Sequence, residues 1–289
     1  MTAGVSAESW LWEQANGATI GPKARKVIEL LAAAPRFTSY ASAGDVAQRA
    51  GTDASTVVRT ARALGFSGWP DLRRELRSRY LSSLSATDLL AEHDTPSSDA
   101  IVRAVRSDAE ALAATARSLD VESCRAVADV VARAGRTLAM GSGSFIGPVA
   151  QLAHVGARLG LTIEAADLGG RTPVSSLALL ETGDCVLIVN FWRLPVEVLA
   201  CARAAGEAGA TVCVITDSRE SRLAHLADHV ITVPAEGTSH FPSLAPATAV
   251  VHALLAEITH RLGERGRATI QRNDQMFARL EQLRREGGG

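Results

Sequence analysis

The chain has 289 residues, 47% of them hydrophobic, and a formal net charge of −1, so it can bury one large core or two modest ones. No segment approaches the about eighteen uninterrupted apolar residues of a membrane-spanning helix, and the first residues do not resemble a secretory leader, so we expect a cytoplasmic protein. Charge is uneven, because residues 1–83 carry eleven Lys/Arg against seven Asp/Glu, about +4, which leaves about −5 for the remainder.

A first helix is predicted over residues 22–34. Val27, Leu30 and Leu31 recur on one face, and Pro22 suits the first turn of a helix, where a backbone N–H is not needed. We expect this helix to support the segment that follows it.

Residues 44–66 read GDVAQRAGTDASTVVRTARALGF and predict two short helices set at a sharp angle. Gly51 tolerates a turn with positive φ, and Asp53 can cap the second helix. The second helix turns its apolar positions inward, at i, i+4 and i+7 from Val57. Its other face then presents side chains suited to a DNA groove, namely Ser55, Thr56, Arg59 and Arg62. Two ordinary helices of an all-α cap remain the alternative.

A further helix is predicted from about residue 70, with Leu72, Leu76 and Tyr80 on one face. The opposite face carries four arginines that we expect to be largely exposed: Arg73, Arg74, Arg77 and Arg79. Arg73 is a candidate contact to DNA phosphates, and a solvated charged face is the alternative.

The run AGTDASTVVRTARALGFSGWPDLRRELRSRYL resembles the N-terminal domain of RpiR-type transcriptional regulators, over roughly residues 20–83. The sequence departs from that pattern at Asp53, where serine is the usual cap, and at Thr60, where phenylalanine is common. Neither departure removes the expected DNA contacts. The resemblance implies that residues 1–83 form an all-α helix-turn-helix domain that binds a double-stranded DNA operator.

Residues 84–100 mix Ser, Asp, Thr and Pro with little periodicity and predict a linker. Helices are expected over 101–119 and 121–134, and residues 84–120 are assigned to the linker and a connecting helix. From residue 136 onward, five strand-like runs alternate with helical segments: TLAMGS, LTIEAAD, DCVLIVNF, ATVCVITD and HVITVPAE. This alternation predicts a doubly wound α/β domain with a parallel sheet covered on both faces.

No metal site or cofactor is expected. The four cysteines, Cys124, Cys185, Cys201 and Cys213, have no CxxC or metal-ligand spacing and are expected to be buried, reduced thiols. His225 and His229 are four residues apart, but no third ligand accompanies them.

Ligands of parallel sheets gather at the carboxyl ends of the strands. The first such loop carries Ser142, Gly143 and Ser144 directly before a predicted helix, so glycine backbone, two hydroxyls and a helix N-terminus favour a bound anion. A purely structural turn is the alternative. Further candidate contacts follow the later strands: Asn190, Arg193, Thr216, Ser218, His240 and Ser243.

Three runs, MGSGSFIGPVAQLAHVGARLG, GDCVLIVNF and AAGEAGATVCVITDSRESRLAHLADHVITV, resemble the SIS domain, from about residue 123 to 261. This resemblance implies a flavodoxin-like, three-layer module that binds phosphosugars and usually follows the RpiR-type head. We therefore assign residues 121–265 to an effector-binding domain. The second loop departs from the pattern, because residues 190–195 read NFWRLP where Ser, Gly and Thr are usual. Arg193 can pair with an anion and Trp192 can stack on a ring, whereas packing of Phe191 and Trp192 on a neighbouring subunit is the alternative.

The preferred interpretation is a transcriptional regulator that senses a small anionic metabolite, a phosphosugar or a sugar acid. A sugar-phosphate isomerase would need a tuned base, and only Glu164, Glu236 and His240 are candidates, without a recognisable acid-base pair. A DNA-binding protein that senses nothing is the third hypothesis.

Specific binding by one small helix-turn-helix domain normally requires a dimer. SIS-type domains also self-associate, so a homodimer or tetramer is expected. Apolar faces suited to this lie over residues 247–262 and 270–283, with Ile270, Phe277 and Leu280 as candidate contacts. Residues 266–289 are assigned to a C-terminal helix and a disordered tail.

Overall fold

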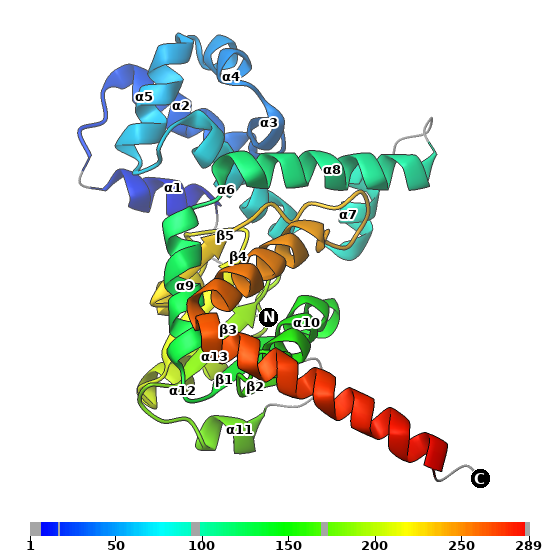
Figure 1. The fold of residues 1–289 in the computed structure, drawn as a ribbon. Coiled ribbons are helices and arrows are strands. Elements are labelled where there is room, and N and C mark those ends of the chain that lie inside the picture. The colour runs from blue at the N-terminus through cyan, green and yellow to red at the C-terminus, as the bar shows by residue number, and fades with distance from the viewer. Residues whose placement is uncertain (1–6, 17, 94–98, 169–172, 287–289) are drawn as a thin grey trace. The chain divides into compact units, whose positions relative to one another are not determined.

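A computed structural model of the chain describes residues 7–16, 18–93, 99–168 and 173–286. It divides into two compact units, Met1–Thr95 and Pro96–Gly289 (Figure 1). Two parts of the sequence-based assignment, residues 94–98 of the expected linker and the expected tail at 287–289, lie outside the described residues.

Within its described residues the first unit is built from helices: α1 (Ala7–Ala15), α2 (Pro22–Ala33), α3 (Pro35–Tyr40), α4 (Ala43–Ala50), α5 (Ala54–Ala63), α6 (Trp69–Ser83) and α7 (Ala86–His93). Their core includes Val27 and Leu31 of α2, Val57 of α5 and Leu72 of α6, all fully buried. The first helix thus supports the two that follow, as its apolar face predicts.

Residues 86–93 form helix α7, although the sequence predicts a linker over 84–100. Ser85 and Asp88 make a reciprocal cap, in which the Asp88 N–H donates to Ser85 Oγ at 3.1 Å and Ser85 Oγ donates to Asp88 Oδ2 at 2.6 Å. Glu92 then accepts from the Tyr80 hydroxyl and from Arg36 Nε, both at 3.1 Å. These hydrogen bonds join residues that are far apart in the sequence, and they hold α7 on the rest of the first unit. Because such contacts leave no periodic pattern in the sequence, the sequence did not predict this helix.

The second unit contains five strands and the helices around them: α8 (Ala100–Ser118), α9 (Val121–Arg133), β1 (Thr137–Gly141), η1 (Gly143–Phe145), α10 (Ile146–Arg158), β2 (Ile163–Asp167), α11 (Val174–Ala178), β3 (Cys185–Val189), α12 (Val196–Glu207), β4 (Thr211–Thr216), η2 (Ala224–Leu226), β5 (His229–Thr232) and α13 (Ala245–Glu286). The strands are all parallel, in the order β2-β1-β3-β4-β5. The predicted doubly wound α/β fold is confirmed.

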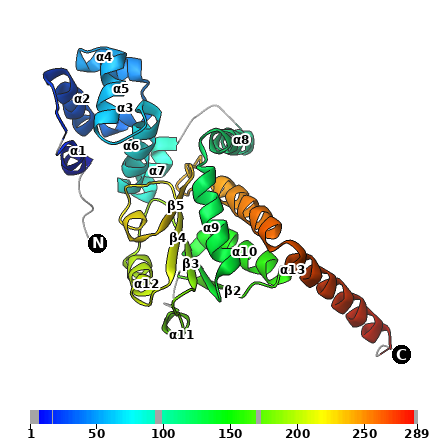
Figure 2. The same cartoon turned by 60° about the vertical axis from the view of Figure 1, so that its left-hand side comes forward.

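Alternate residues of each central strand enter two separate cores. Ala139, Leu187 and Cys213 pack toward α9, α10 and α13, whereas their neighbours Leu138 and Val186 pack toward α12. Figure 2 shows these helices on opposite sides of the sheet, which gives three layers. Because both faces are covered, β1 and β3 are buried along their whole length.

The chain reverses its winding between β1 and β3, since β1 leads outward to β2 and the chain then returns to β3 on the other side of β1. The loops that follow β1 and β3 therefore border the switch point, where doubly wound sheets bind ligands.

Helix α13 runs through both predicted helical segments, 247–262 and 270–283, with a break at Gly263, whose φ of 51° and ψ of −126° are not helical. Both views show the part after the break extending away from the sheet (Figures 1 and 2). Phe277 and Leu280 on this part are 73% and 52% exposed.

All four cysteines are free and buried, as predicted. Burial raises the pKa of the Cys124 thiol to about 11, so it stays protonated. Among the described residues, no helix is long and apolar enough to cross a membrane.

Candidate functional site

Helices α4 and α5 form the predicted helix-turn-helix. Ser42 and Asp45 cap α4 reciprocally, with Asp45 N to Ser42 Oγ at 3.2 Å and Ser42 N to Asp45 Oδ2 at 3.0 Å. Gly51 ends α4 at φ 63°, a left-handed conformation that glycine adopts without strain. Asp53 then caps α5, because its Oδ1 accepts from Thr56 N at 2.8 Å. The turn and cap predicted at Gly51 and Asp53 are confirmed.

The inward face of α5 also follows the prediction, since Val57, Ala61 and Leu64 are at most 2% exposed. On the other side, Ser55, Arg59 and Arg62 are exposed. The Ser55 hydroxyl donates to Asp53 Oδ1 at 2.5 Å, and Arg62 Nε donates to the Ser67 carbonyl at 3.4 Å.

Thr56 does not face solvent, and its predicted orientation is wrong. The residue is 5% exposed; its hydroxyl donates to Asp53 Oδ2 at 2.9 Å and accepts from Arg59 Nη2 at 3.1 Å. The cause is the cap, which pulls the third residue of α5 back onto Asp53. Hydrogen bonds from Ser55 and Thr56 lower the pKa of the Asp53 carboxyl, so it remains ionised.

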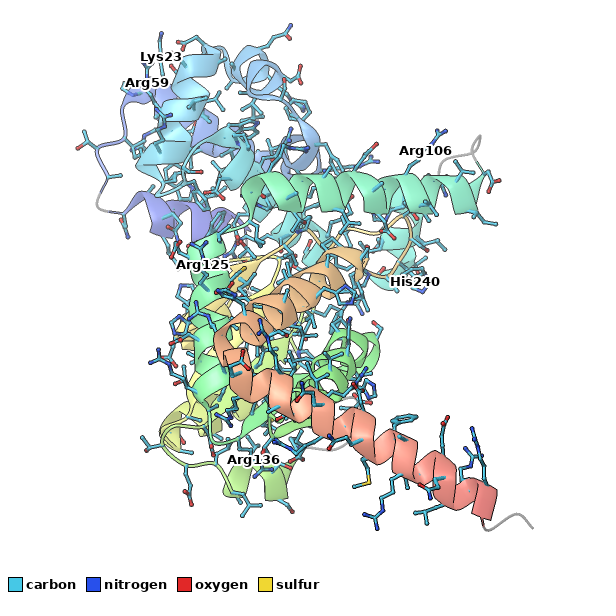
Figure 3. All side chains as sticks on the ribbon, viewed as in Figure 1. Lys23, Arg59, Arg106, Arg125, Arg136 and His240 are labelled. Atoms are coloured by element: carbon cyan, nitrogen blue, oxygen red, sulfur yellow. The ribbon has the colours of Figure 1, made fainter. Side chains whose placement is uncertain are left out.

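Lys23 joins this surface, although the sequence did not single it out. Its Nζ lies 3.7 Å from Asp53 Oδ2, and Arg59 Nη2 lies 4.0 Å from Asp53 Oδ1. Figure 3 shows Lys23 on α2 beside Arg59 on α5. The signal in the sequence was the basic start of α2, where Lys23, Arg25 and Lys26 follow Pro22.

The α6 arginines are not a free solvated face, and their predicted exposure is wrong. Arg73 is half-buried, and its Nη1 donates to the Ala41 carbonyl at 3.4 Å. The other three make contacts within the first unit: Arg74 with Asp71, Arg77 over the Tyr40 ring, and Arg79 with Glu75. Because α6 packs on α3 and α1, these side chains fold against the protein.

At the carboxyl edge of the sheet, the loop after β1 holds Ser142 half-buried and leaves Gly143 and Ser144 exposed. Gly143 has φ 60°, and its N–H donates to Asp167 Oδ1, at the end of β2, at 3.3 Å. Gly141 is also required, because a Cβ there would lie 2.5 Å from the Phe145 carbonyl oxygen. A glycine turn is present as predicted, but a carboxylate contacts the loop in which an anion was expected.

The loop after β3 is closed by packing. Phe191 is 1% exposed and meets Phe145 of the first loop edge-on, with ring centroids 5.5 Å apart. Trp192 has φ 55°, unusual for a bulky residue, and its N–H donates to Asp217 Oδ1 at 3.3 Å. An aromatic pair therefore bridges the two loops of the switch point. Sequence reasoning missed Phe145, and placed Phe191 at a subunit boundary as one alternative.

Asn190 directly follows β3 and is 3% exposed, and its Nδ2 donates to the Arg193 carbonyl at 3.0 Å. Its Oδ1 is buried and accepts no hydrogen bond from any described residue. Arg193 itself is exposed. A buried acceptor without a donor is costly, so this oxygen is an unsatisfied polar atom at the end of a central strand.

The remaining predicted ligand contacts differ in how far their side chains are exposed. Thr216, the last residue of β4, is 3% exposed, and Ser218, in the loop that follows, is 7% exposed. His240 is exposed and lies on the outer bend of the connection between β5 and α13 (Figure 3). Ser243 is half-buried, and its Oγ donates to Asp108 Oδ1 of α8 at 2.6 Å. Strand adjacency brings the loops after β1, β3 and β4 together, and the His240 side chain is exposed to solvent.

Glu164 is one of the three acid-base groups considered for an isomerase. Glu164 is held by hydrogen bonds from Ser176 Oγ and Arg136 Nη2, which lower the pKa of its carboxyl and weaken it as a base. Among the described residues, no group of three His, Cys, Asp or Glu side chains could hold a metal ion.

Two family descriptions match the chain: "Helix-turn-helix domain, rpiR family" over residues 14–83 and "SIS domain" over residues 165–257. The sugar isomerase domain of an RpiR transcription factor from Sphaerobacter thermophilus is 31% identical, with a TM-score of 0.57, and the match covers 61% of this chain and 98% of that one.

Two further structures share the fold at lower identity. Vibrio vulnificus NanR in complex with ManNAc-6P is 21% identical, with a TM-score of 0.58, over 94% of this chain and 99% of that one. A ligand-bound protein from Escherichia coli CFT073 is 19% identical, with a TM-score of 0.51, over 66% of this chain and 100% of that one.

Proposed function

Because the chain belongs to the RpiR family of transcriptional regulators, we propose that it binds a DNA operator through α5 and that a small anionic metabolite at its SIS domain changes the operator affinity. The observation that carries this proposal is the combination of an exposed Arg59 on a capped second helix with a glycine turn at the switch point of a parallel sheet. We place this activity in the cytoplasm, where the DNA is.

Arg59, Arg62 and Ser55 are the proposed groove contacts, and Lys23 is added as a phosphate contact from the start of α2. Thr56 acts indirectly, because its hydroxyl positions Arg59. Arg73 is proposed only as a support for the helix packing, since its guanidinium is bonded to Ala41.

The proposed ligand is a phosphosugar or a sugar acid. Exposed Arg193 can pair with a phosphate or a carboxylate, and the Asn190 oxygen can accept a sugar hydroxyl. Ser142 and Ser144 supply hydroxyls in the loop after β1, and Gly143 would exchange its bond to Asp167 for the ligand. Thr216, Ser218, Ser243 and His240 are the outer candidate contacts. The ManNAc-6P bound by NanR is a phosphosugar example on the same fold, and it motivates the choice of compounds for a screen.

We propose that the protein works as a homodimer or a tetramer, with the exposed second part of α13 as one contact surface. Its Phe277 and Leu280 are exposed, and an operator of two half-sites matches two copies. Light scattering on the full chain tests this assembly; a monomer at micromolar concentration would contradict it.

A thermal-shift screen tests the sensing function directly. Glucose 6-phosphate, 6-phosphogluconate, N-acetylmannosamine 6-phosphate and unphosphorylated gluconate form the panel. A compound that binds only the folded protein stabilises it by about 2.7 kcal/mol at one hundred times its Kd. We expect stabilisation by at least one phosphorylated compound. Stabilisation by none, with operator binding intact, would favour a regulator that senses nothing; turnover of a sugar phosphate would favour an isomerase.

A further inference from the structure

Helix α8 is tied to the ligand edge by its own carboxylate. Ser243 precedes α13 in the loop after β5, and its Oγ donates to Asp108 Oδ1 at 2.6 Å. Ser243 Oγ also accepts a hydrogen bond from Ala245 N at 3.2 Å. A serine hydroxyl has one proton to donate, so the donor of Ser243 is committed to Asp108.

A second tie lies just beyond the C-terminal end of α8. Asp120 caps α9 through Ser123 N at 3.1 Å, and its Oδ2 also accepts from Arg219 Nη2 at 3.1 Å. Arg219 directly follows Ser218 in the loop after β4. We call the two pairs, Asp108 with Ser243 and Asp120 with Arg219, the α8 latch.

The two pairs differ in strength. The Asp120 and Arg219 side chains are 39% and 54% exposed, so solvent screens their attraction. Asp108 and Ser243 are both half-buried and joined by a short bond to a charged acceptor. Asp108 is therefore the main member of the α8 latch.

Helix α8 packs on α13 but buries little of its own surface. Of its 19 residues, only Thr115 is buried, and the apolar side chains of Ile101 and Val105 are 76% and 65% exposed. An element with so little buried surface opens at low free-energy cost, so losing one strong hydrogen bond changes its stability measurably.

The α8 latch presents carboxylates to two donors on the same edge as the proposed ligand site. A phosphate or carboxylate that accepts from the Ser243 hydroxyl must take the place of Asp108, because that hydroxyl has one proton to donate. An anion that pairs with Arg219 weakens the attraction between Arg219 and Asp120, because the two anions repel each other. In chain order, α8 is also the first described helix after the segment that joins the two units.

We propose that the α8 latch competes with the metabolite: its carboxylates occupy the outer anion contacts in the protein without ligand, and an anion that replaces them frees α8. This release of α8 is the step by which the ligand changes the operator affinity. This inference rests on the proposed function for its ligand and its DNA readout, and on the Asp108–Ser243 bond for its mechanism.

Asp108→Ala in the full-length protein tests the α8 latch, with Glu110→Ala as the matched control. Glu110 lies two residues further along α8 and is exposed. Hydrogen exchange without any ligand should be at least about threefold faster at α8 amides in Asp108→Ala than in Glu110→Ala, because the helix loses its main tie. Equal exchange in the two variants would overturn the proposal.

Binding of 6-phosphogluconate, measured by calorimetry, supplies the second readout. Removing the competing carboxylate should tighten binding about fivefold in Asp108→Ala, equivalent to about 1 kcal/mol. Asp108→Asn, which keeps an acceptor without the charge, should lie between that variant and the wild type. Unchanged affinity in Asp108→Ala, where the wild type binds, would overturn the competition.

Failure of the proposed function would look different from failure of the α8 latch. In that case neither the wild type nor any variant would bind operator DNA or 6-phosphogluconate. Hydrogen exchange alone would then decide: faster exchange in Asp108→Ala would still support the tie between α8 and Ser243, and unaltered exchange would reject it.

Discussion

The helix-turn-helix and the carboxyl edge of the sheet differ in how their polar side chains are committed. On α5, the Arg59 side chain is held by Thr56 at 3.1 Å and is still 69% exposed, so a DNA groove can meet it in the position that it already occupies. At the sheet edge, Ser243 is bonded to Asp108, Gly143 donates to Asp167, and Phe191 fills the space beside Phe145. The DNA surface is therefore preformed, whereas a ligand at the edge must exchange partners with the protein.

Breaking the Phe145–Phe191 aromatic pair should have the largest effect on the unfolding free energy. Phe191→Ala deletes a ring that is 1% exposed, and loss of a buried phenylalanine costs about 3–5 kcal/mol of unfolding free energy. Urea denaturation of the full chain measures the loss. Phe241→Ala, at a residue that is 57% exposed, is the control and should change stability by less than about 0.5 kcal/mol. A similar small loss in Phe191→Ala would mean that packing does not hold this loop closed.

Arg59→Ala should weaken operator binding by about 1–3 kcal/mol at matched salt, because it removes an exposed groove contact from a preformed surface. Footprinting of the full chain measures the change, and thermal denaturation should show the fold intact. Arg203→Ala, at an exposed arginine of α12, is the control for lost positive charge. Equal affinity in the Arg59 and Arg203 variants would place DNA recognition on another surface.

Ser144→Glu should weaken anion binding by about tenfold or more, about 1.4 kcal/mol, since a carboxylate at the glycine turn repels the ligand charge. Ser144 is exposed, so the variant should fold normally. Calorimetry with the phosphorylated compound that stabilises the protein most in the thermal screen gives the affinity. Ser144→Ala controls for the lost hydroxyl, and a folded glutamate variant with wild-type affinity would move the site away from this loop.

The smallest expected effect is on acid stability. Bonds from Ser176 and Arg136 lower the folded-state pKa of Glu164, so their stabilisation is present above the unfolded pKa of about 4.3 and is lost as pH falls through the folded value. The side chain is 42% exposed, so the contribution should stay below about 1 kcal/mol.

Denaturation of Glu164→Gln at pH 7 and pH 3 measures that contribution. The difference in stability between the two pH values should be smaller in this variant than in the wild type. Glu207→Gln, at an exposed residue of α12, should leave the difference unchanged. The same pH dependence in both variants would exclude a stabilising role for the Glu164 contacts.

Periodicity and capping residues predicted the fold class of both units, but not every helix. The spacing of Val57, Ala61 and Leu64, the turn at Gly51 and the alternation of strands with helices are local patterns, and each is present in the structure. Helix α7 was missed because its attachment depends on Glu92 meeting Arg36 and Tyr80, which are distant along the chain.

The sequence located each candidate site to a helix or loop. It did not predict which of the side chains there are buried or which hydrogen bonds they make. Helical spacing places Thr56 on the outer face of α5, yet the Asp53 cap turns its hydroxyl inward. Strand ends place Ser243 at the ligand edge, yet nothing near it in the sequence indicates that Asp108, 135 residues earlier, accepts a hydrogen bond from its hydroxyl. Such partners follow from tertiary packing, which a single sequence pattern does not encode.

Operator affinity with and without ligand tests the central claim most directly. The full-length protein would be titrated onto its operator, alone and with a saturating amount of the best compound from the thermal screen. The account predicts a shift of about 5- to 150-fold in operator affinity, and an equal shift in ligand affinity when operator is present, because coupling between two sites is reciprocal. Unchanged operator affinity at saturating ligand would contradict it.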